Sequence, residues 1–337
     1  MRNIYDLTIK ELEDYFISIN EKKFRAVQVY EALYKRRITS FDDMTNISKE
    51  VREKLKQDFS FYKIKMLIKQ QGKNVNKYLF ELEDGNKIES VLMFHDYGTS
   101  ICVSSQVGCN MTCAFCESGR LKKVRNLLAY EIVQQILQIE EDINKRITHV
   151  VLMGIGEPFD NYDNVLRFVK IINCGKGIDI GSRHITISTC GVIPGIKKFM
   201  NEEGQVNLAI SLHAPNDTLR SRIMPINKAY PLNELMETIK EYINKTNRRV
   251  TFEYIMLDNV NDSEENAKEL AILLKGINCY VNLIPYNETE NIEFKRTKEW
   301  KIMKFYDILK KNKINVTIRK EFGGSVDAAC GQLRANN

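Results

Sequence analysis

The stretch that decides the fold is Cys109-Asn-Met-Thr-Cys113-Ala-Phe-Cys116, in which three cysteines stand close together on one short segment. An apolar segment typical of a β-strand precedes it, and a segment of helical length follows it. Three thiolates on one loop can bind three irons of a 4Fe-4S cluster and leave the fourth iron open to an added ligand. The sequence therefore predicts that Cys109, Cys113 and Cys116 hold such a cluster.

Two other uses of these cysteines compete with the cluster. A structural zinc site needs four tetrahedral ligands, and no fourth cysteine or histidine adjoins the run. A redox pair formed by Cys113 and Cys116 leaves Cys109 unused and lacks the neighbouring sequence usual for that motif. The alternative to an enzyme is therefore a zinc-binding protein that recognises RNA and catalyses no reaction.

Downstream of the cysteines, strand-like segments alternate with amphipathic segments of helical length, which is typical of βα units with parallel strands. The predicted strands are 100–107, 148–153, 184–188, 206–212, 250–256, 281–284 and 316–319. The predicted helices are 129–144, 161–172, 194–201, 231–244, 263–276 and 298–311. Six such units are too few for a closed eight-fold barrel, so the fold class is α/β with an open, partial (β/α)6 barrel whose binding site lies at the C-terminal ends of the strands.

Upstream of the cysteines, the chain has a different pattern. Residues 1–70 read as a small helical domain, because Thr8 and Glu11 form a capping box and apolar residues then recur at helical spacing. The polar stretch 70–76 reads as a linker, and residues 77–83 and 87–94 alternate around a tight turn as a β-hairpin. The predicted domains are 1–70, a linker and hairpin over 71–99, and the barrel over 100–337.

Composition limits the class of protein. The chain of 337 residues has 43% hydrophobic and 28% charged residues, and neither a long apolar run nor a signal peptide, which predicts a cytoplasmic protein without membrane attachment. Eight cysteines are too few for a disulfide scaffold. The net charge of +6 is mild, but Lys and Arg exceed Asp and Glu most clearly at the two ends of the chain, which fits an RNA-facing rim as well as ordinary solvated surface.

Unusual residues stand at successive predicted strand ends. They are Gly154-Ile-Gly-Glu157, Ser188-Thr-Cys190, Ser211-Leu-His213 and Asn287. Each of them alone is more often a satisfied turn residue than a ligand. Their shared position at one edge of the predicted sheet favours a binding site.

At this point the sequence resembles a known family. The cysteine spacing is similar to that of the radical S-adenosylmethionine (SAM) superfamily, and longer motifs resemble the RlmN/Cfr methyltransferases, which methylate adenine in RNA. The motifs are Ser104-Ser-Gln-Val-Gly-Cys109 through Cys116, Gly154-Ile-Gly-Glu-Pro158, Ile210-Ser-Leu-His-Ala-Pro-Asn216, Met224-Pro-Ile-Asn227 and Asp327-Ala-Ala-Cys-Gly-Gln-Leu333. Residues 24–28 and 44–48 also resemble the helical accessory domain of the RlmN branch.

The resemblance implies roles for individual residues. The open iron of the cluster would chelate SAM, of which two molecules are used per turnover. The SAM-binding residues would be Gly156, Glu157, Ser188, Ser211, Leu212, His213 and Asn287. Cys330 would carry the methyl group, Cys102 would later form a disulfide with Cys330, and Glu89 would accept the proton from the base.

The resemblance also implies partners and a branch. The substrates would be 23S rRNA and tRNA, the electron donor a flavodoxin or ferredoxin, and the enzyme a monomer. Pro158 and the N-terminal segment favour methylation at carbon 2 of adenine, with Cfr-like methylation at carbon 8 as the alternative. The sequence departs from the family pattern at Glu117-Ser118, Leu121-Lys122, Cys190 and Glu288. Cys174, Cys190 and Cys279 read as small packing residues without function.

Overall fold

The fold is organised around one twisted, curved sheet. A computed structural model describes residues 1–202, 204–289 and 291–319. Within these ranges ten strands form the sheet, in the order β14-β13-β12-β11-β10-β9-β6-β5-β4-β3. Their bounds are β3 (Lys65–Gly72), β4 (Val75–Glu81), β5 (Lys87–His95), β6 (Gly98–Cys102), β9 (His149–Leu152), β10 (Ile185–Thr189), β11 (Asn207–Ser211), β12 (Val250–Met256), β13 (Cys279–Pro285) and β14 (Val316–Ile318).

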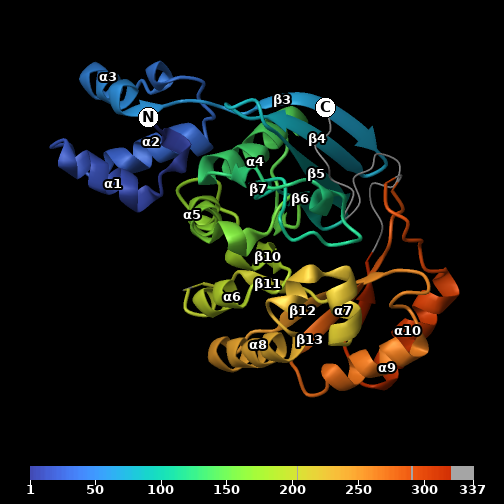
Figure 1. Cartoon of the computed structure of the whole chain (residues 1–337). Helices are drawn as coiled ribbons and strands as arrows, with labels where there is room; N and C mark the ends of the chain where they lie inside the picture. Colours follow the sequence, from blue (N-terminus) through green and yellow to red (C-terminus); the bar gives the residue numbers. More distant parts are fainter. Residues whose placement is uncertain (203, 290, 320–337) are drawn as a thin grey trace.

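The half of the sheet from β6 to β14 is parallel, as the alternating pattern predicts. The crossover helices include α4 (Ala129–Ile143), α5 (Tyr162–Asn173), α6 (Ile193–Phe199), α8 (Leu232–Thr246), α9 (Glu264–Leu273) and α10 (Glu299–Lys311). Figure 1 shows these helices along the outer side of the curved sheet. Among the described residues β14 and β3 are not paired with each other, so the predicted open, partial barrel is confirmed.

The antiparallel half of the sheet corrects one prediction. The predicted hairpin exists as β4 and β5, but the polar stretch 70–76 is not a linker. It forms the end of β3, a turn and the start of β4, and β3 pairs with β4 over its whole length. Burial of β3 is slight, so its polar sequence carries little strand signal. The sheet therefore runs without interruption from the hairpin into the barrel.

Two further elements near the cysteine loop differ from the prediction. The strand predicted over 100–107 ends at Cys102, and residues Gln106–Val107 form a separate short strand, β7, that pairs with β8 (Arg125–Asn126). The short helix α7 (Asp217–Ile223) was not predicted. A seven-residue helix is too short to show a clear helical period in the sequence.

The N-terminal lobe is helical, as predicted. It contains α1 (Ile9–Ser18), α2 (Arg25–Tyr34), α3 (Lys49–Asp58) and a short parallel pair, β1 (Arg2–Asn3) with β2 (Phe59–Ser60). The predicted capping box is present, because the Thr8 hydroxyl accepts from the Glu11 backbone and the Glu11 carboxylate accepts from the Thr8 backbone. Short 3-10 turns also occur at Ile4–Asp6, Phe41–Asp43, Glu117–Arg120, Pro158–Asn161, Ser182–His184 and Pro225–Lys228.

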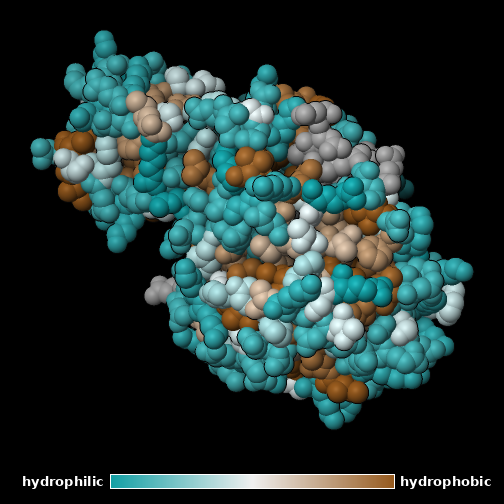
Figure 2. Space-filling view, viewed as in Figure 1, coloured by the Kyte–Doolittle hydropathy of each residue, from teal (hydrophilic) through white to brown (hydrophobic). Residues whose placement is uncertain are grey.

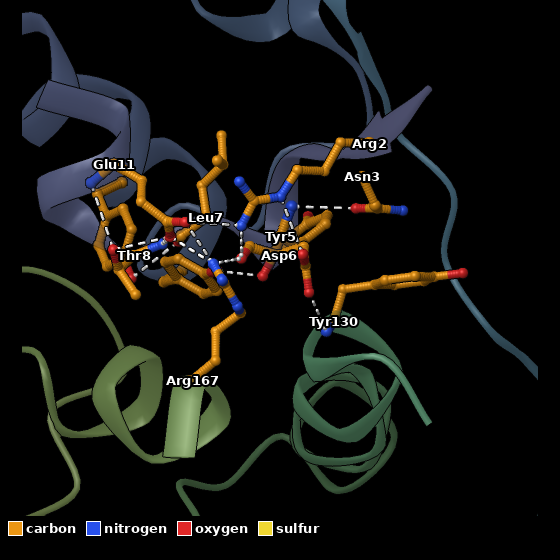
Figure 3. Close-up of polar contacts among 11 residues, drawn as sticks. Arg2, Asn3, Tyr5, Asp6, Leu7, Thr8, Glu11, Tyr130 and Arg167 are labelled. Atoms are coloured by element: carbon orange, nitrogen blue, oxygen red, sulfur yellow. Dashed lines mark hydrogen bonds and ion pairs between the residues drawn. The ribbon is translucent and has the colours of Figure 1, made fainter. Parts of the chain in front are cut away.

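A polar network joins this lobe to the barrel (Figure 3). One guanidinium nitrogen of Arg167 on α5 lies 2.5 and 2.6 Å from the two carboxylate oxygens of Glu11. The backbone N–H of Tyr130 on α4 donates to the Asp6 carboxylate at 3.3 Å. Buried residues of the lobe also belong to the same hydrophobic core as the barrel. Across the described ranges, no helix has both the length and the apolar character needed to cross a bilayer.

Candidate active site

One cavity at the C-terminal ends of the parallel strands brings the predicted site residues together. It holds about 820 Å³ of atom-free space, counting the part open to solvent, which is large enough for a nucleoside cofactor. Its lining includes Cys109, Cys113, Cys116, Gly156, Glu157, Ser188, Ser211 and His213. Figure 2 shows apolar groups gathered across the middle of the face in view, within a mostly hydrophilic surface.

Backbone hydrogen bonds hold the cysteine loop over the cavity. The loop connects β7 to β8, and the pairing of these two short strands holds its two ends together. The N–H of Cys109 donates to the carbonyl of Leu121 at 2.8 Å, and the N–H of Ala114 donates to the carbonyl of Ile223 at 2.9 Å. Gly108 begins the loop with φ +73, and a Cβ atom there would lie 2.3 Å from the Lys122 carbonyl oxygen. Glycine is therefore required where the loop closes on itself.

The three thiols fit a cluster better than a single ion. All three border the same cavity, and each influences the charge of the others. Burial raises the pKa of Cys109 to about 12 and that of Cys113 further, so iron must displace their protons on binding. Within the described ranges, however, no three His, Cys, Asp or Glu side chains are arranged to hold one metal ion. Three cysteines on one loop provide the three thiolates that a 4Fe-4S cluster with one open iron takes.

Glu157 is buried at the strand end beside the loop. Its carboxylate accepts from the backbone N–H of Phe159 at 3.0 Å and from the backbone N–H of Cys190 at 2.8 Å. Burial raises its pKa, although these hydrogen bonds oppose the rise. Glu157 therefore ties the end of β9 to the end of β10 while one side of its carboxylate still borders the cavity.

The neighbouring glycine lets this turn pack closely. Gly156 has φ +107, and a Cβ atom there would lie 2.6 Å from Cβ of Gln106. The Gln106 side chain accepts from the backbone N–H of Glu157 at 2.9 Å. The close approach of the two backbones thus depends on glycine, and it fixes the position of Glu157.

His213 is buried at the end of β11 and is held in one tautomer. Its Nδ1 accepts from the backbone N–H of Ile255 at 3.0 Å, which leaves the proton of the neutral ring on Nε2. Burial, together with the charge of Arg220, lowers its pKa to about 3. The ring packs edge-on against the ring of Phe115 in the cysteine loop, with 4.8 Å between the two ring centroids. His213 is therefore a neutral hydrogen-bond donor at the cavity wall.

The structure separates the remaining predicted cofactor contacts into two groups. Ser188 and Ser211 border the cavity. Leu212 is fully buried in the hydrophobic core, and its carbonyl accepts from Arg220. Asn287 is half-buried beyond the end of β13 and is not part of the cavity lining. Cys330 lies outside the described residues.

Glu89 and Cys102 lie on the inner face of the antiparallel part of the sheet. The sequence alone makes Glu89 an exposed strand residue, yet its side chain is buried. Its carboxylate lies 3.1 Å from the ammonium group of Lys77, which is also nearly buried. Lys77, Val91 and Cys102 form one row across three strands, so the ion pair and Cys102 lie on the same face of the sheet.

Sequence reasoning missed three polar groups around the cavity. Cys190 packs in a hydrophobic cluster, as expected, and it also borders the cavity. Glu253 of β12 also borders it, is buried, and accepts from the Asn282 side chain at 2.9 Å. A single acidic residue within an otherwise apolar parallel strand was the signal available for Glu253. Arg220 of α7 lies behind the cavity, and its sequence context gave no signal.

Comparison with known proteins places the chain in a family. Residues 2–60 match the family described as the ribosomal RNA large subunit methyltransferase N-terminal domain, and residues 103–271 match the radical SAM superfamily. A protein of Spiroplasma citri named a probable dual-specificity RNA methyltransferase RlmN is 54% identical over 100% of this chain and 98% of its own length. A protein of Enterococcus faecalis with the same name is 54% identical over 99% of this chain and 96% of its own length.

A solved structure gives the same result. The crystal structure of a radical SAM methyltransferase from Sphaerobacter thermophilus is 41% identical in sequence and superposes with a TM-score of 0.94, covering 100% of both chains. The resemblance found in the motifs is thus confirmed over the whole length of the chain. This chain belongs to the RlmN family of radical SAM methyltransferases.

Proposed function

We propose that this chain methylates carbon 2 of an adenine in RNA, with 23S rRNA and tRNA as its substrates, and that it uses two molecules of SAM in each turnover. The observation that carries the proposal is that three cysteine thiols border the same cavity as Glu157, Ser188, Ser211 and His213. The RlmN relatives favour carbon 2 over the Cfr-like alternative at carbon 8.

The residues of the cavity fit a cluster and SAM in distinct places. Cys109, Cys113 and Cys116 would hold the cluster through their thiolates. When bound, the cluster supplies the electron that cleaves SAM to a 5′-deoxyadenosyl radical. Glu157 is suited to the ammonium group of the methionine part, because its buried carboxylate is fixed by two backbone N–H groups. The neutral His213 ring donates from Nε2, and the hydroxyl groups of Ser188 and Ser211 offer further contacts.

A methyl group on a protein thiol explains the remaining residues. Carbon 2 of adenine is electron-poor and cannot displace a methyl group from a sulfonium, so a radical route is needed. Cys330 would first be methylated, and its S-methyl group would then lose a hydrogen atom to the radical and attach to carbon 2. The radical adduct would return one electron to the cluster, and Glu89 would remove the proton from carbon 2. The Cys102 thiolate would then attack the sulfur of Cys330, so the bond between that sulfur and the transferred carbon breaks as the disulfide forms, and the transferred carbon takes up a proton to become the methyl group. Burial of Glu89 on the same face of the sheet as Cys102 supports this division of roles.

The RNA must present its adenine unstacked. A base in a loop or bulge is easier to open than a base in a duplex, and base-modifying enzymes generally act on extruded bases. Lys and Arg exceed Asp and Glu over residues 1–70, and the polar contacts of the helical lobe with α4 and α5 hold the lobe at a fixed position on the barrel. Lysines and arginines there would bind phosphate and position the RNA without reading its sequence.

Further partners follow from the reaction. Cluster reduction requires a one-electron donor such as a flavodoxin or ferredoxin, and we propose that the enzyme works as a monomer in the cytoplasm. The expectation that the protein does not attach to a membrane rests on the composition of the chain.

Two thiol variants test the proposed route. In Cys330→Ala, we expect methylation of RNA to be abolished while iron content stays that of the parent protein. In Cys102→Ala, we expect RNA to remain covalently attached to the protein, visible as a shifted band on a denaturing gel. Full methylation by Cys330→Ala would contradict the thiol route, and a colourless wild-type protein with one bound zinc would favour the alternative.

A further inference from the structure

Arg220 of α7 is fully buried without a carboxylate partner among the described residues. Its Nε donates to the carbonyl of Leu212 at 3.2 Å, and Nη2 donates to the carbonyls of Cys190 at 2.7 Å and Ser211 at 3.2 Å. Its Nη1 donates to the side-chain oxygen of Asn227 at 2.9 Å. Each of these acceptors is neutral, and the Asp217 carboxylate, which accepts from the Asn227 side chain at 2.7 Å, offsets the cost of burying the guanidinium charge only in part.

A buried charge that is compensated only in part is costly and needs a reason. Removing an ion from water costs several kcal/mol even after the protein has relaxed around it. Burial lowers the pKa of Arg220, but a guanidinium group still stays protonated in a protein. Neutral side chains could join the ends of β10 and β11 without this cost. A negative charge near Arg220 would offset it.

The site places such a charge beside α7. The backbone N–H of Ala114, in the middle of the cysteine loop, donates to the carbonyl of Ile223 at the end of α7. The thiols of Cys113 and Cys190 both act electrostatically on the Arg220 guanidinium. Three thiolates give a 4Fe-4S cluster a net negative charge, and each added electron increases that charge. A cluster held by this loop would therefore add negative charge close to Arg220.

We propose that Arg220 is the internal counter-charge of the cluster and raises its reduction potential. The proposal rests on the cofactor assignment above and adds a residue that does not touch the cluster, SAM or RNA. Reduction transfers one electron from the external donor to the cluster, and no other bond forms or breaks. Because the product of this step is more negative than the reactant, a fixed positive charge favours the product.

The burial of Arg220 makes this effect strong and constant. Solvent and salt screen exposed lysines such as Lys122, whereas a buried charge is screened far less. Four hydrogen bonds hold the guanidinium in place, so it does not have to reorganise when the electron arrives. The charge of Arg220 also adds to the effect of burial in lowering the pKa of His213 at the cavity wall. Arg220 thus acts as a positioning residue for charge.

The test compares Arg220→Gln, which removes the charge, with Arg220→Lys, which keeps the charge but cannot form the same four bonds. Both full-length proteins are reconstituted without oxygen, and the reduction potential is measured by titration followed by electron paramagnetic resonance, without SAM or RNA. We expect Arg220→Gln to lower the equilibrium constant for reduction about tenfold, which is about 59 mV for one electron. Arg220→Lys should stay close to the wild type. Asn227→Ala is the matched control, because it removes one hydrogen-bond acceptor of Arg220 but not the charge.

Each result decides the question. If cluster-loaded Arg220→Gln has the reduction potential of the wild type, the proposal is wrong. It is also wrong if the reduction potential of Arg220→Lys or Asn227→Ala falls as far as that of Arg220→Gln. If Arg220→Gln takes up no cluster, the test rests on Arg220→Lys. An unchanged reduction potential in Arg220→Lys supports the role of charge. A lowered potential shows that Arg220 acts only through its hydrogen bonds. A wild-type protein that takes up no 4Fe-4S cluster contradicts the proposed function itself.

Discussion

Lys77 and Glu89 form a nearly buried ion pair, with 3.1 Å between the ammonium nitrogen and a carboxylate oxygen, on the same sheet face as Cys102. Removing one partner of a buried pair leaves an uncompensated charge. In Lys77→Met, the Glu89 carboxylate would lose this partner and its fixed position on the sheet face. We expect the rate of RNA methylation to fall at least about tenfold.

Lys69→Met is the matched control for this prediction. Lys69 lies on β3 in the same sheet, but its ion pair is with Asp142 of α4, on the helical side. Rates of both variants are measured between about pH 6 and pH 9. If Lys77→Met and Lys69→Met have the same rate at every pH, Lys77 has no role in the reaction.

The cysteine loop gives the second prediction. In Cys113→Ala, one of three cluster ligands is lost, so we expect the reconstituted protein to lose its brown colour and most of about four irons per chain. Cys279→Ala serves as the control, since Cys279 is buried in β13 and is part of the hydrophobic core. Iron and acid-labile sulfide analysis decides the matter: equal iron in the two variants would show that Cys113 is not a ligand.

The contact between lobe and barrel gives the third prediction. Burial tends to raise the pKa of Glu11, but hydrogen bonds from Arg167, Thr8 and Arg2 outweigh it and lower the pKa to about 2. A carboxyl group with a lowered pKa stabilises the folded state above its ordinary pKa, and this contribution is lost as the pH falls from about 4.5 toward 2. Because Glu11 and Arg167 are each about one third exposed, the pair contributes only about 0.5 to 1 kcal/mol.

Arg167→Met tests this contact. At pH 7 we expect the cluster-free variant to unfold in urea with a free energy lower by about 0.5 to 1 kcal/mol. The difference from the parent protein should shrink as the pH is lowered from about 4.5 to about 3, because Glu11 takes up a proton in the unfolded chain over this range while the folded parent protein keeps it ionised. A difference that stays constant between these pH values would mean that Arg167 acts through packing and not through the charge of Glu11.

The floor of the cavity gives the fourth prediction. Glu253 is buried, pairs in register with Ser211, and borders the cavity. A carboxylate in this position can accept hydrogen bonds from hydroxyl groups of a bound nucleoside. We expect Glu253→Ala to weaken SAM binding about tenfold, which is about 1.4 kcal/mol and typical of a lost charge-assisted hydrogen bond.

Equilibrium dialysis of reconstituted protein with labelled SAM measures this effect. Glu237→Ala is the control, because Glu237 is an exposed residue of α8. Equal affinities of the two variants, with equal cluster content, would exclude Glu253 from the cofactor site.

The sequence predicted the parts of the molecule whose signals are local. Cys109 to Cys116 are neighbours in the chain, and the Thr8–Glu11 capping box depends on residues three positions apart. The parallel strands are also evident, because buried strands read as short apolar runs. For the same reason the strand ends at Glu157, Ser188 and Ser211 could be placed at one edge of the sheet.

Tertiary packing decided what the sequence did not show. Glu89 has the pattern of an exposed strand residue, and it becomes buried only because β4 and β6 flank it in the sheet. The short strand β3 is polar because it lies at the sheet edge with little burial. Arg220 is an ordinary helical arginine in sequence, and only the fold places it behind the cavity.

The central claim is that this chain adds a methyl group to carbon 2 of adenine in RNA. The most direct measurement is mass spectrometry of nucleosides from RNA that has been incubated with the reconstituted enzyme, SAM and a reductant, with authentic 2-methyladenosine and 8-methyladenosine as standards. We predict that 2-methyladenosine appears with the wild-type enzyme and is absent with Cys330→Ala. Accumulation of 8-methyladenosine, or of no methylated adenosine by an enzyme with an intact cluster, would contradict the account.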